Sequence, residues 1–224
     1  NGGTNWKVLS SGFSQNLRSV SFTSLNMGMA VGDSGVVLST MNSGKKWEQI
    51  ENFFPENLRD VHVISPTKAW MCGDNGRILE CSLAGTPSVI AQTTPTSSTL
   101  HSIRMVNDDL GYAVGNEGII LQTVNKGVTW NLLSSPTQLN LGGVYAVNSQ
   151  VAFVVGESGT ILKTSNGGKD WVIQASGTSS HLDGVYFADE KTGWAVGDVG
   201  VIRHTTDGRS EEHTSELQSP DLIS

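Results

Sequence analysis

The sequence is poor in several features that define common protein classes. It has two cysteines, too few for a disulfide framework, and its apolar runs are only a few residues long. No segment is therefore predicted to span a bilayer. Lysine and arginine number 14 against 21 acidic residues, which gives a net charge of −7. Because a nucleic-acid partner requires a basic footprint, this balance argues against one.

Glycine, in contrast, is abundant, with 26 residues placed at regular intervals. The phrase GESGTILKTSNGGKDW at Gly156–Trp171 recurs, whole or altered, from Gly32, Gly73, Gly115 and Gly197. The lead glycines are separated by 41, 42, 41 and 41 residues. A fixed period of about 20–50 residues is the signature of a repeat architecture. The repeat therefore decides the fold class.

Each repeat contains four short runs of β-branched and aromatic residues between polar turns, which are strand signals. Four antiparallel strands in a repeat of about 41 residues predict an all-β fold, a β-propeller that forms part of a ring. We expect the complete ring to hold seven blades, although a strand starting at Trp6 could instead close a ring of five with the last blade. The expected segments are an outer strand of a preceding blade at 1–10, blades at 17–50, 58–91, 100–133 and 141–174, and a partial blade at 182–208.

Both ends of the chain interrupt the repeat. Asn1–Trp6 matches Asn166–Trp171, so we expect the chain to open inside a repeat unit. From Arg209 the text RSEEHTSELQS leaves the repeat and resembles the translation of a common sequencing adapter. We therefore expect 209–224 to be an artefactual tail outside the propeller fold.

The turn between the third and fourth strands carries the pattern T-x-N-x-G-x-x-W. The asparagine and threonine side chains are expected to bond nearby backbone groups, and the tryptophan is expected to anchor the outer strand against the next blade. In the second blade Leu83 and Ser88 replace the asparagine and tryptophan, so this blade is expected to be the softest. The complete copies are Thr40, Asn42, Gly44, Trp47; Thr123, Asn125, Gly127, Trp130; and Thr164, Asn166, Gly168, Trp171.

Both cysteines fall in the second blade. If the turn after Gly73 closes a hairpin, Cys72 and Cys81 lie roughly 13 Å apart along the ladder at the usual strand rise. A disulfide needs Cα atoms within about 7 Å. We therefore expect two free thiols that only contribute to packing.

The turn pattern resembles the Asp-box, or BNR repeat, of sialidases and other propellers. The blade phrase as a whole is similar to the photosystem II stability/assembly factor family, whose members are propellers of the lumen. This resemblance implies an exported, non-enzymatic protein without a cofactor, which holds a newly made reaction-centre subunit during assembly. Two alternatives stay open: a secreted or cell-surface propeller of a non-photosynthetic bacterium, and a sialidase-like glycoside hydrolase.

Three arginines on or near inner strands are the candidate residues for binding a protein partner: Arg18, Arg59 and Arg104. Arginine is favoured at interfaces because its planar group pairs with carboxylates and stacks on aromatic rings. The Gly turns also present a polar residue in each repeat, namely Asp33, Asp74, Asn116, Glu157 and Asp198. These suit either an acidic ring or ordinary turn chemistry. No histidine spacing suggests a metal site, and no catalytic constellation stands out.

Overall fold

The computed structural model describes residues 4–208. The expected tail at 209–224 lies outside these residues. Two compact units are present, Asn1–Ala113 with Gln122–Asn131, and Val114–Leu121 with Leu132–Ser224, and each is considered by itself below. The described secondary structure consists of strands and five single 3₁₀ turns, so the predicted all-β propeller fold is confirmed.

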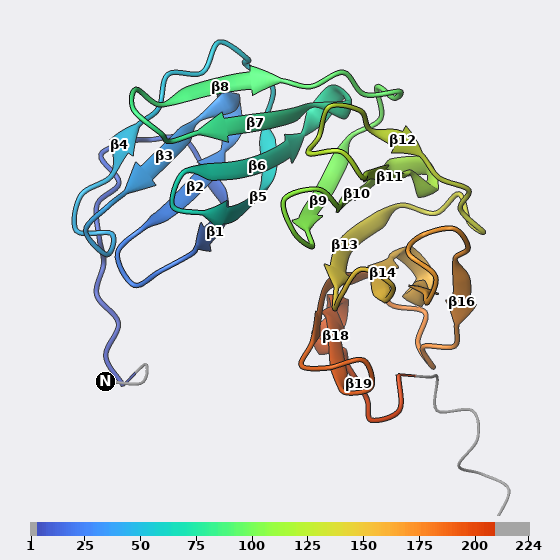
Figure 1. Cartoon of the computed structure of the whole chain (residues 1–224). Helices are drawn as coiled ribbons and strands as arrows, with labels where there is room; N and C mark the ends of the chain where they lie inside the picture. Colours follow the sequence, from blue (N-terminus) through green and yellow to red (C-terminus); the bar gives the residue numbers. More distant parts are fainter. Residues whose placement is uncertain (1–3, 209–224) are drawn as a thin grey trace, which may run out of the picture. The chain divides into compact units, whose positions relative to one another are not determined.

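The strands form four antiparallel sheets of four strands and one of three in the described chain (Figure 1). Sheet 1 consists of β1 (Leu17–Phe22), β2 (Gly28–Gly32), β3 (Val37–Thr40) and β4 (Glu48–Gln49). Sheet 2 consists of β5 (Leu58–Ser65), β6 (Lys68–Gly73), β7 (Ile78–Ser82) and β8 (Ser88–Ala91). Sheet 3 consists of β9 (Leu100–Met105), β10 (Gly111–Gly115), β11 (Ile120–Thr123) and β12 (Asn131–Leu132).

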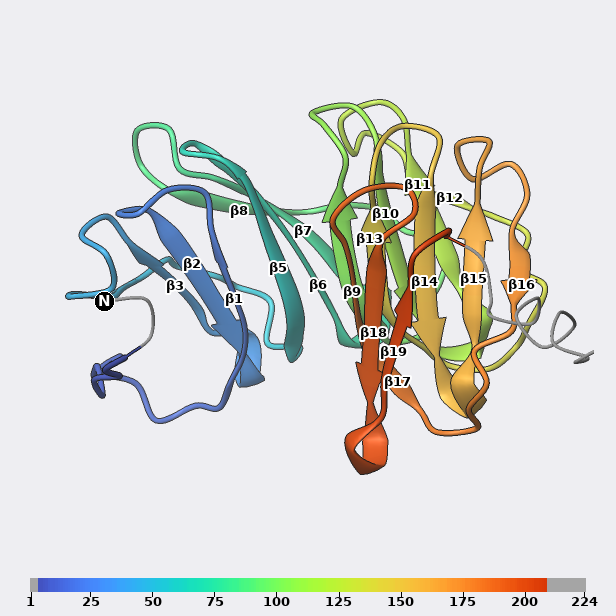
Figure 2. The same cartoon turned by 90° about the horizontal axis from the view of Figure 1, so that it is seen from below.

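Sheet 4 consists of β13 (Leu141–Ala146), β14 (Ala152–Gly156), β15 (Ile161–Thr164) and β16 (Val172–Gln174). Sheet 5 consists of β17 (Leu182–Phe187), β18 (Gly193–Gly197) and β19 (Ile202–Thr205). Figure 2 shows the strands of these two sheets, which belong to the second unit, lying side by side. In every sheet the strands follow one another in chain order, as in a propeller blade.

A tight turn joins the second and third strands of each sheet. The turns are η1 (Asp33–Gly35), η2 (Asp74–Gly76), η3 (Asn116–Gly118), η4 (Glu157–Gly159) and η5 (Asp198–Gly200). Their central residue has a positive φ, 55° at Ser34 for example, and the following glycine does too. The glycine before the turn is required for a different reason: a Cβ on Gly73 would lie 2.1 Å from the Asn57 carbonyl oxygen. The turn therefore brings the start of the first strand against the end of the second.

The core lies between sheets, because each sheet has two apolar faces. We call the face that contains Met29, Val31 and Val37 in sheet 1 the forward face, and the face that contains Leu58, Val61 and Val63 in sheet 2 the backward face. These six residues belong to one buried cluster in the first unit. In the second unit the forward face of sheet 4, at Phe153 and Val155, packs in the same way against sheet 5.

Two expectations about tryptophan require correction. The ring of Trp130 lies against Trp70 of the preceding sheet, with centroids 5.8 Å apart, and not against the next blade. The tryptophan at the start of the fourth strand lies on the backward face of its sheet, and this face packs against the preceding sheet.

The outer strand expected at 1–10 does not form in residues 4–16, where Trp6 is 92% exposed. An outer strand pairs with a third strand of its own sheet, and the described residues show no such pairing for Trp6–Leu9.

Cys72 and Cys81 are both buried and free, as expected. They pair with Ile78 and Ala69 in the sheet ladder, and therefore lie at different levels of sheet 2. Burial raises the pKa of both thiols, that of Cys81 to about 12. Because the thiolate is the reactive form, both are poor nucleophiles near neutral pH.

Candidate functional site

The candidate site starts from an irregularity at the beginning of the inner strands. In β1, Leu17 pairs with Gly32 and Ser19 with Val31, so Arg18 is an extra residue in a bulge. Arg59 occupies the same place in β5, between Leu58 and Asp60. A bulge leaves the extra residue out of the ladder and redirects its side chain. Both arginines are thereby turned toward the Gly turn of their own sheet.

Each arginine forms an ion pair with the aspartate that opens this turn. Arg18 Nε lies 2.5 Å from Asp33 Oδ1, and the Asn16 amide donates to the other carboxylate oxygen at 2.9 Å. The pair is partly exposed, with 38% of the Arg18 side chain accessible. The hydrogen bonds from Arg18 and Asn16 lower the pKa of Asp33. Asp33 is therefore a carboxylate at neutral pH, already neutralised by its partner.

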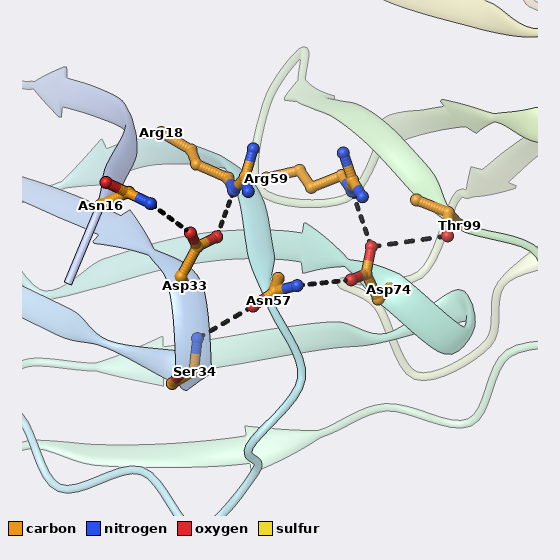
Figure 3. Close-up of polar contacts among 8 residues, drawn as sticks. All are labelled: Asn16, Arg18, Asp33, Ser34, Asn57, Arg59, Asp74 and Thr99. Atoms are coloured by element: carbon orange, nitrogen blue, oxygen red, sulfur yellow. Dashed lines mark hydrogen bonds and ion pairs between the residues drawn. The ribbon is translucent and has the colours of Figure 1, made fainter.

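Sheet 2 repeats this arrangement with one additional contact (Figure 3). Arg59 Nε lies 2.7 Å from Asp74 Oδ1, and the Asn57 amide donates to the other carboxylate oxygen at 2.9 Å. The additional contact is the Thr99 hydroxyl, which donates to Asp74 Oδ1 at 3.5 Å. Burial alone would raise the pKa of Asp74, but the hydrogen bonds from Arg59 and Asn57 outweigh it and lower the pKa.

The two ion pairs are linked by a backbone contact. The Ser34 N–H in the turn of sheet 1 donates to the Asn57 side-chain oxygen at 3.0 Å, as Figure 3 shows. Asn57 therefore bridges the two turns, since its amide nitrogen is bound to Asp74. The result is a continuous polar strip from Asp33 to Asp74 with two guanidinium groups fixed along it.

The second unit keeps the bridging asparagine without the arginine. Asn140 accepts from the Glu117 N–H at 3.0 Å and donates to Glu157 at 2.8 Å. The bulge position of β13 is Gly142, and in β17 it is Asp183, which lies 3.0 Å from His181. The asparagine is thus part of the scaffold, whereas the arginine is specific to sheets 1 and 2.

Arg104 is separated from the pair. It lies near the end of β9, whereas Arg18 and Arg59 lie near the start of their strands. Its neighbour is His62, whose pKa is lowered to about 4 by burial and by the charge of Arg104. Neutral His62 accepts the Met105 N–H at 3.0 Å. The structure thus brings two of the three candidate arginines together.

The polar residues of the Gly turns do not form an open acidic ring, because Asp33, Asp74 and Glu157 are bound by the contacts above. Among residues 4–208, no cluster of three histidine, cysteine or acidic side chains could hold a metal ion. No helix in this part of the chain is long and apolar enough to cross a membrane.

The Asp-box residues form identical turns in three sheets. The Thr40 hydroxyl donates to the Asn42 side-chain oxygen at 3.1 Å and accepts from the Gly44 N–H at 3.0 Å. Corresponding bonds connect Thr123 with Asn125 and Gly127, and Thr164 with Asn166 and Gly168. These groups satisfy one another inside the turn, which indicates a structural role.

The residue types in the sequence indicate Arg18 and Arg59 as candidates but do not by themselves identify their partners. The signal was present, because both arginines stand 15 residues before their aspartate. The asparagine precedes its acidic partner by 17 residues in sheets 1, 2 and 4. Two matching separations in successive repeats would have predicted the ion pairs.

Comparison with known proteins places this chain among propellers. The family model described as photosynthesis system II assembly factor YCF48 matches residues 41–182 and 123–222. A solved structure titled YCF48 bound to D1 peptide shares 19% identity, with 92% of this chain and 84% of that chain covered and a TM-score of 0.50. YCF48 from Cyanidioschyzon merolae shares 15% identity, with 91% and 86% covered and a TM-score of 0.55.

A glycoside hydrolase, the GH74 enzyme of Niastella koreensis, has a TM-score of 0.66 at 16% identity, with 87% of this chain and 30% of that chain covered. Likeness at this identity shows the propeller fold alone. No curated protein matches this sequence. The family model covers most of the chain, so the chain belongs to the family of the photosynthesis system II assembly factor YCF48.

Proposed function

We propose that this chain is a non-enzymatic propeller that binds a photosystem reaction-centre subunit and holds that membrane protein during assembly. The family match supports an assembly factor, and the observation that carries the binding site is the pair of fixed arginines at Arg18 and Arg59. A relative in this fold was solved with a D1 peptide, which makes a peptide of that kind the first partner to test.

Both arginines are prepared to receive a carboxylate. Each ion pair engages Nε, so the aspartate holds the guanidinium by one edge and fixes its direction. A guanidinium has five N–H donors in a planar fork that matches a carboxylate. A partner with an acidic group is therefore expected to bind across the strip between Asp33 and Asp74. Arg104, on the neighbouring inner strand, would contact a more distant part of the same partner.

The geometry favours binding over catalysis. A sialidase-like site would need three arginines around one carboxylate and a tyrosine activated by a glutamate. Here Arg18 and Arg59 are each held by their own aspartate, and Tyr112 is buried with its hydroxyl bonded to Gln122. We assign the protein to an exported compartment, the thylakoid lumen or periplasm, in keeping with its family. A secreted propeller of a non-photosynthetic bacterium is the alternative assignment.

The test is calorimetric titration of a D1 peptide into the wild-type chain and into the double variant Arg18→Gln, Arg59→Gln. We expect the double variant to lose at least tenfold in affinity, because charge-assisted hydrogen bonds contribute about 1.5–3 kcal/mol each. Lys46→Gln is the control, since Lys46 is also a surface cation in an ion pair, with Glu48 at 2.7 Å.

Glutamine is preferred to glutamate at both positions, because a glutamate would face Asp33 or Asp74 and disturb the turn. Thermal melting of each variant separates lost binding from lost folding. Unchanged affinity of a folded double variant, or turnover of a sialoside or other glycoside, would overturn the proposal.

A further inference from the structure

The inner strand of sheet 3 carries a histidine at the place where sheets 1 and 2 carry their arginines. β9 begins with the sequence LHS, whereas β1 begins with LRS and β5 with LRD. His101 is therefore the third residue of this series, after Arg18 and Arg59, and it is half-buried. An arginine is always cationic, but a histidine can change its charge in the range of about pH 5–8.

The exposure of the residues along β9 matches that along β5. Each strand starts with a buried leucine, continues with two half-buried residues, and alternates between buried and half-buried residues up to its sixth position. Two successive half-buried residues break the period of two that a regular strand shows. In β5 this break is the bulge at Arg59. The same break at the same place in β9 indicates that His101 is turned out of the ladder in the same way.

Hydrogen bonds set β9 against β5 as they set β5 against β1. The Val61 N–H donates to the Ser19 hydroxyl at 3.4 Å, and the Ile103 N–H donates to the Asp60 carboxylate at 3.0 Å. A second pair of bonds, two residues further along each strand, repeats this pattern. The second residue of β9 therefore lies beside β5 as the second residue of β5 lies beside β1.

Contacts on both sides of His101 place it at the end of the polar strip. Two residues before it, the Thr99 hydroxyl donates to Asp74 Oδ1 at 3.5 Å, and Asp74 is the last residue of the strip (Figure 3). One residue after it, the Ser102 hydroxyl donates to Asp60 at 3.0 Å. His101 is thus held between the Gly turn and the inner strand of sheet 2.

The balance of charge changes at this position. In sheets 1 and 2 each arginine is neutralised by the aspartate that opens its Gly turn. In sheet 3 the residue that opens the turn is Asn116, which carries no charge. The two corresponding residues of sheet 3 are therefore neutral while the histidine is neutral, and they add one positive charge when it is protonated.

The groups around β9 in the first unit were compared for their own titration. The pKa of Asp74 is lowered despite its burial, and that of His62 is lowered to about 4 by burial and by Arg104, so neither changes charge between about pH 6 and 8. Burial raises the pKa of Asp60, and its titration has to be separated from that of His101 by the variants used. The charged and titratable residues on the elements packed against β9 in this unit are Arg59, Asp60, His62, Lys68, Cys72 and Asp74, with Arg104 on β9 itself.

We propose that His101 is a third partner-binding residue of the polar strip, and that it makes the binding of an acidic partner stronger as pH falls. This inference rests on the proposed function, because it concerns the same partner at the same site. Protonation gives the imidazole a positive charge and a second N–H donor. It then pairs with a carboxylate of the partner next to the one that Arg59 binds, by a charge-assisted hydrogen bond.

The test is calorimetric titration of a D1 peptide at several pH values between about 8 and 6. The peptide is N-acetylated and free of histidine, so that it does not titrate in this range. The affinity of the wild type is expected to rise about fivefold as pH falls, as for a partly exposed ion pair. His101→Gln is expected to keep the weaker affinity at every pH, and His101→Arg the stronger one. Titrations in buffers of different ionisation enthalpy should show proton uptake on binding by the wild type and none by either variant.

His181→Gln is the matched control, since His181 is a partly exposed histidine of sheet 5 that lies 3.0 Å from Asp183. This variant should keep the pH dependence of the wild type. Circular dichroism and melting verify that each variant is folded across the pH range.

Two results would overturn this inference and leave the proposed function standing. The first is wild-type binding that is lost in the double variant Arg18→Gln, Arg59→Gln but does not vary with pH. The second is a pH dependence that His101→Gln retains, which would assign it to another group such as Asp60. Absence of peptide binding by the wild type at every pH would overturn the proposed function and this inference together.

Discussion

At the scale of single residues, one carboxylate connects three inner strands of the first unit. Asp60 on β5 accepts the Ser19 hydroxyl of β1 at 2.7 Å, and the Ser102 hydroxyl and Ile103 N–H of β9 at 3.0 Å each. The position in the other inner strands is held by serine or glycine, so the acid is particular to sheet 2. It joins three neighbouring sheets, which are also connected by hydrogen bonds such as Ser34 N–H to Asn57 and Met105 N–H to His62.

Asp60 should make folding stability depend on pH. Burial raises its pKa, and the hydrogen bonds from Ile103 and Ser19 oppose the shift without cancelling it. The folded state therefore binds the proton more tightly than the unfolded state, so this stabilisation is present at low pH and is lost as pH rises through the folded pKa. Asp60→Asn removes the titration. Urea unfolding at several pH values should show that the free energy of unfolding of the wild type rises relative to that of the variant as pH falls. The rise is at most about 1.4 kcal/mol per pH unit. A difference that does not vary with pH would contradict this account.

The threonine of the Asp-box gives a second prediction at this scale. Thr123 is fully buried, and its hydroxyl accepts the Gly127 N–H at 2.9 Å. Thr123→Ala leaves this buried N–H without an acceptor, so the free energy of unfolding should fall by about 1–3 kcal/mol. Thr123→Ser keeps the hydroxyl and should recover most of the loss in urea unfolding. Equal loss in both variants would assign the effect to the methyl group.

At the scale of elements, the turn between third and fourth strands differs most from sheet to sheet. In sheet 2, where Leu83 and Ser88 replace the asparagine and tryptophan, the outer strand β8 has four residues, against two in β4 and β12. Leu83 and Val89 pack against the buried core of the first unit. The longer ladder and these apolar contacts supply attachment that the tryptophan provides elsewhere.

Removal of the anchoring tryptophan should therefore lower stability much more than a change at the corresponding position of β8, which has no tryptophan. Trp130→Ala removes a ring that is 4% exposed and packed on Trp70, and it should cost about 3–5 kcal/mol of stability. Ser88→Ala changes an exposed side chain and should stay within about 0.5 kcal/mol. Urea midpoints and slopes of the two variants provide the comparison. Similar losses would contradict the alignment of these positions in the repeat.

The repeat determined how much of the fold was predictable. A glycine period of about 41 residues places five sets of strands, because every set must close the same hairpin and bury the same faces. The neighbour of Trp130 was not predictable in this way, since a repeat does not say which adjacent blade a side chain meets. The prediction of an outer strand at 1–10 was wrong for the described residues, because similarity to a fourth strand does not show whether a third strand lies beside it.

The candidate site was less accessible to such reasoning. Arg18 and Arg59 were identified by residue type, but their direction depends on a bulge that one-dimensional alternation does not reveal. The sequence predicts Arg104 as a third member because it also lies on an adjacent inner strand. Arg104 is the fifth residue of β9, three positions beyond the place that corresponds to Arg18 and Arg59 in their strands. This offset along the strand separates Arg104 from the other two arginines.

At the scale of the whole molecule, the blades serve as supports for one polar strip. The apolar faces hold sheets 1 and 2 together, and this packing sets the distance between their Gly turns. Asn57 then connects the two turns, and the bulges direct Arg18 and Arg59 onto them. Under the proposed function, the repeated positions stabilise the sheets, and the two bulge arginines bind the partner.

The most direct test of protein binding is the salt dependence of a titration with a D1 peptide. If the arginine pair receives an acidic group of the peptide, calorimetry should show saturable 1:1 binding at low ionic strength. The affinity should fall severalfold between about 0.05 and 0.5 M salt, because exposed charges are screened over the Debye length. Absence of binding, or an affinity that does not change with salt, would contradict the account.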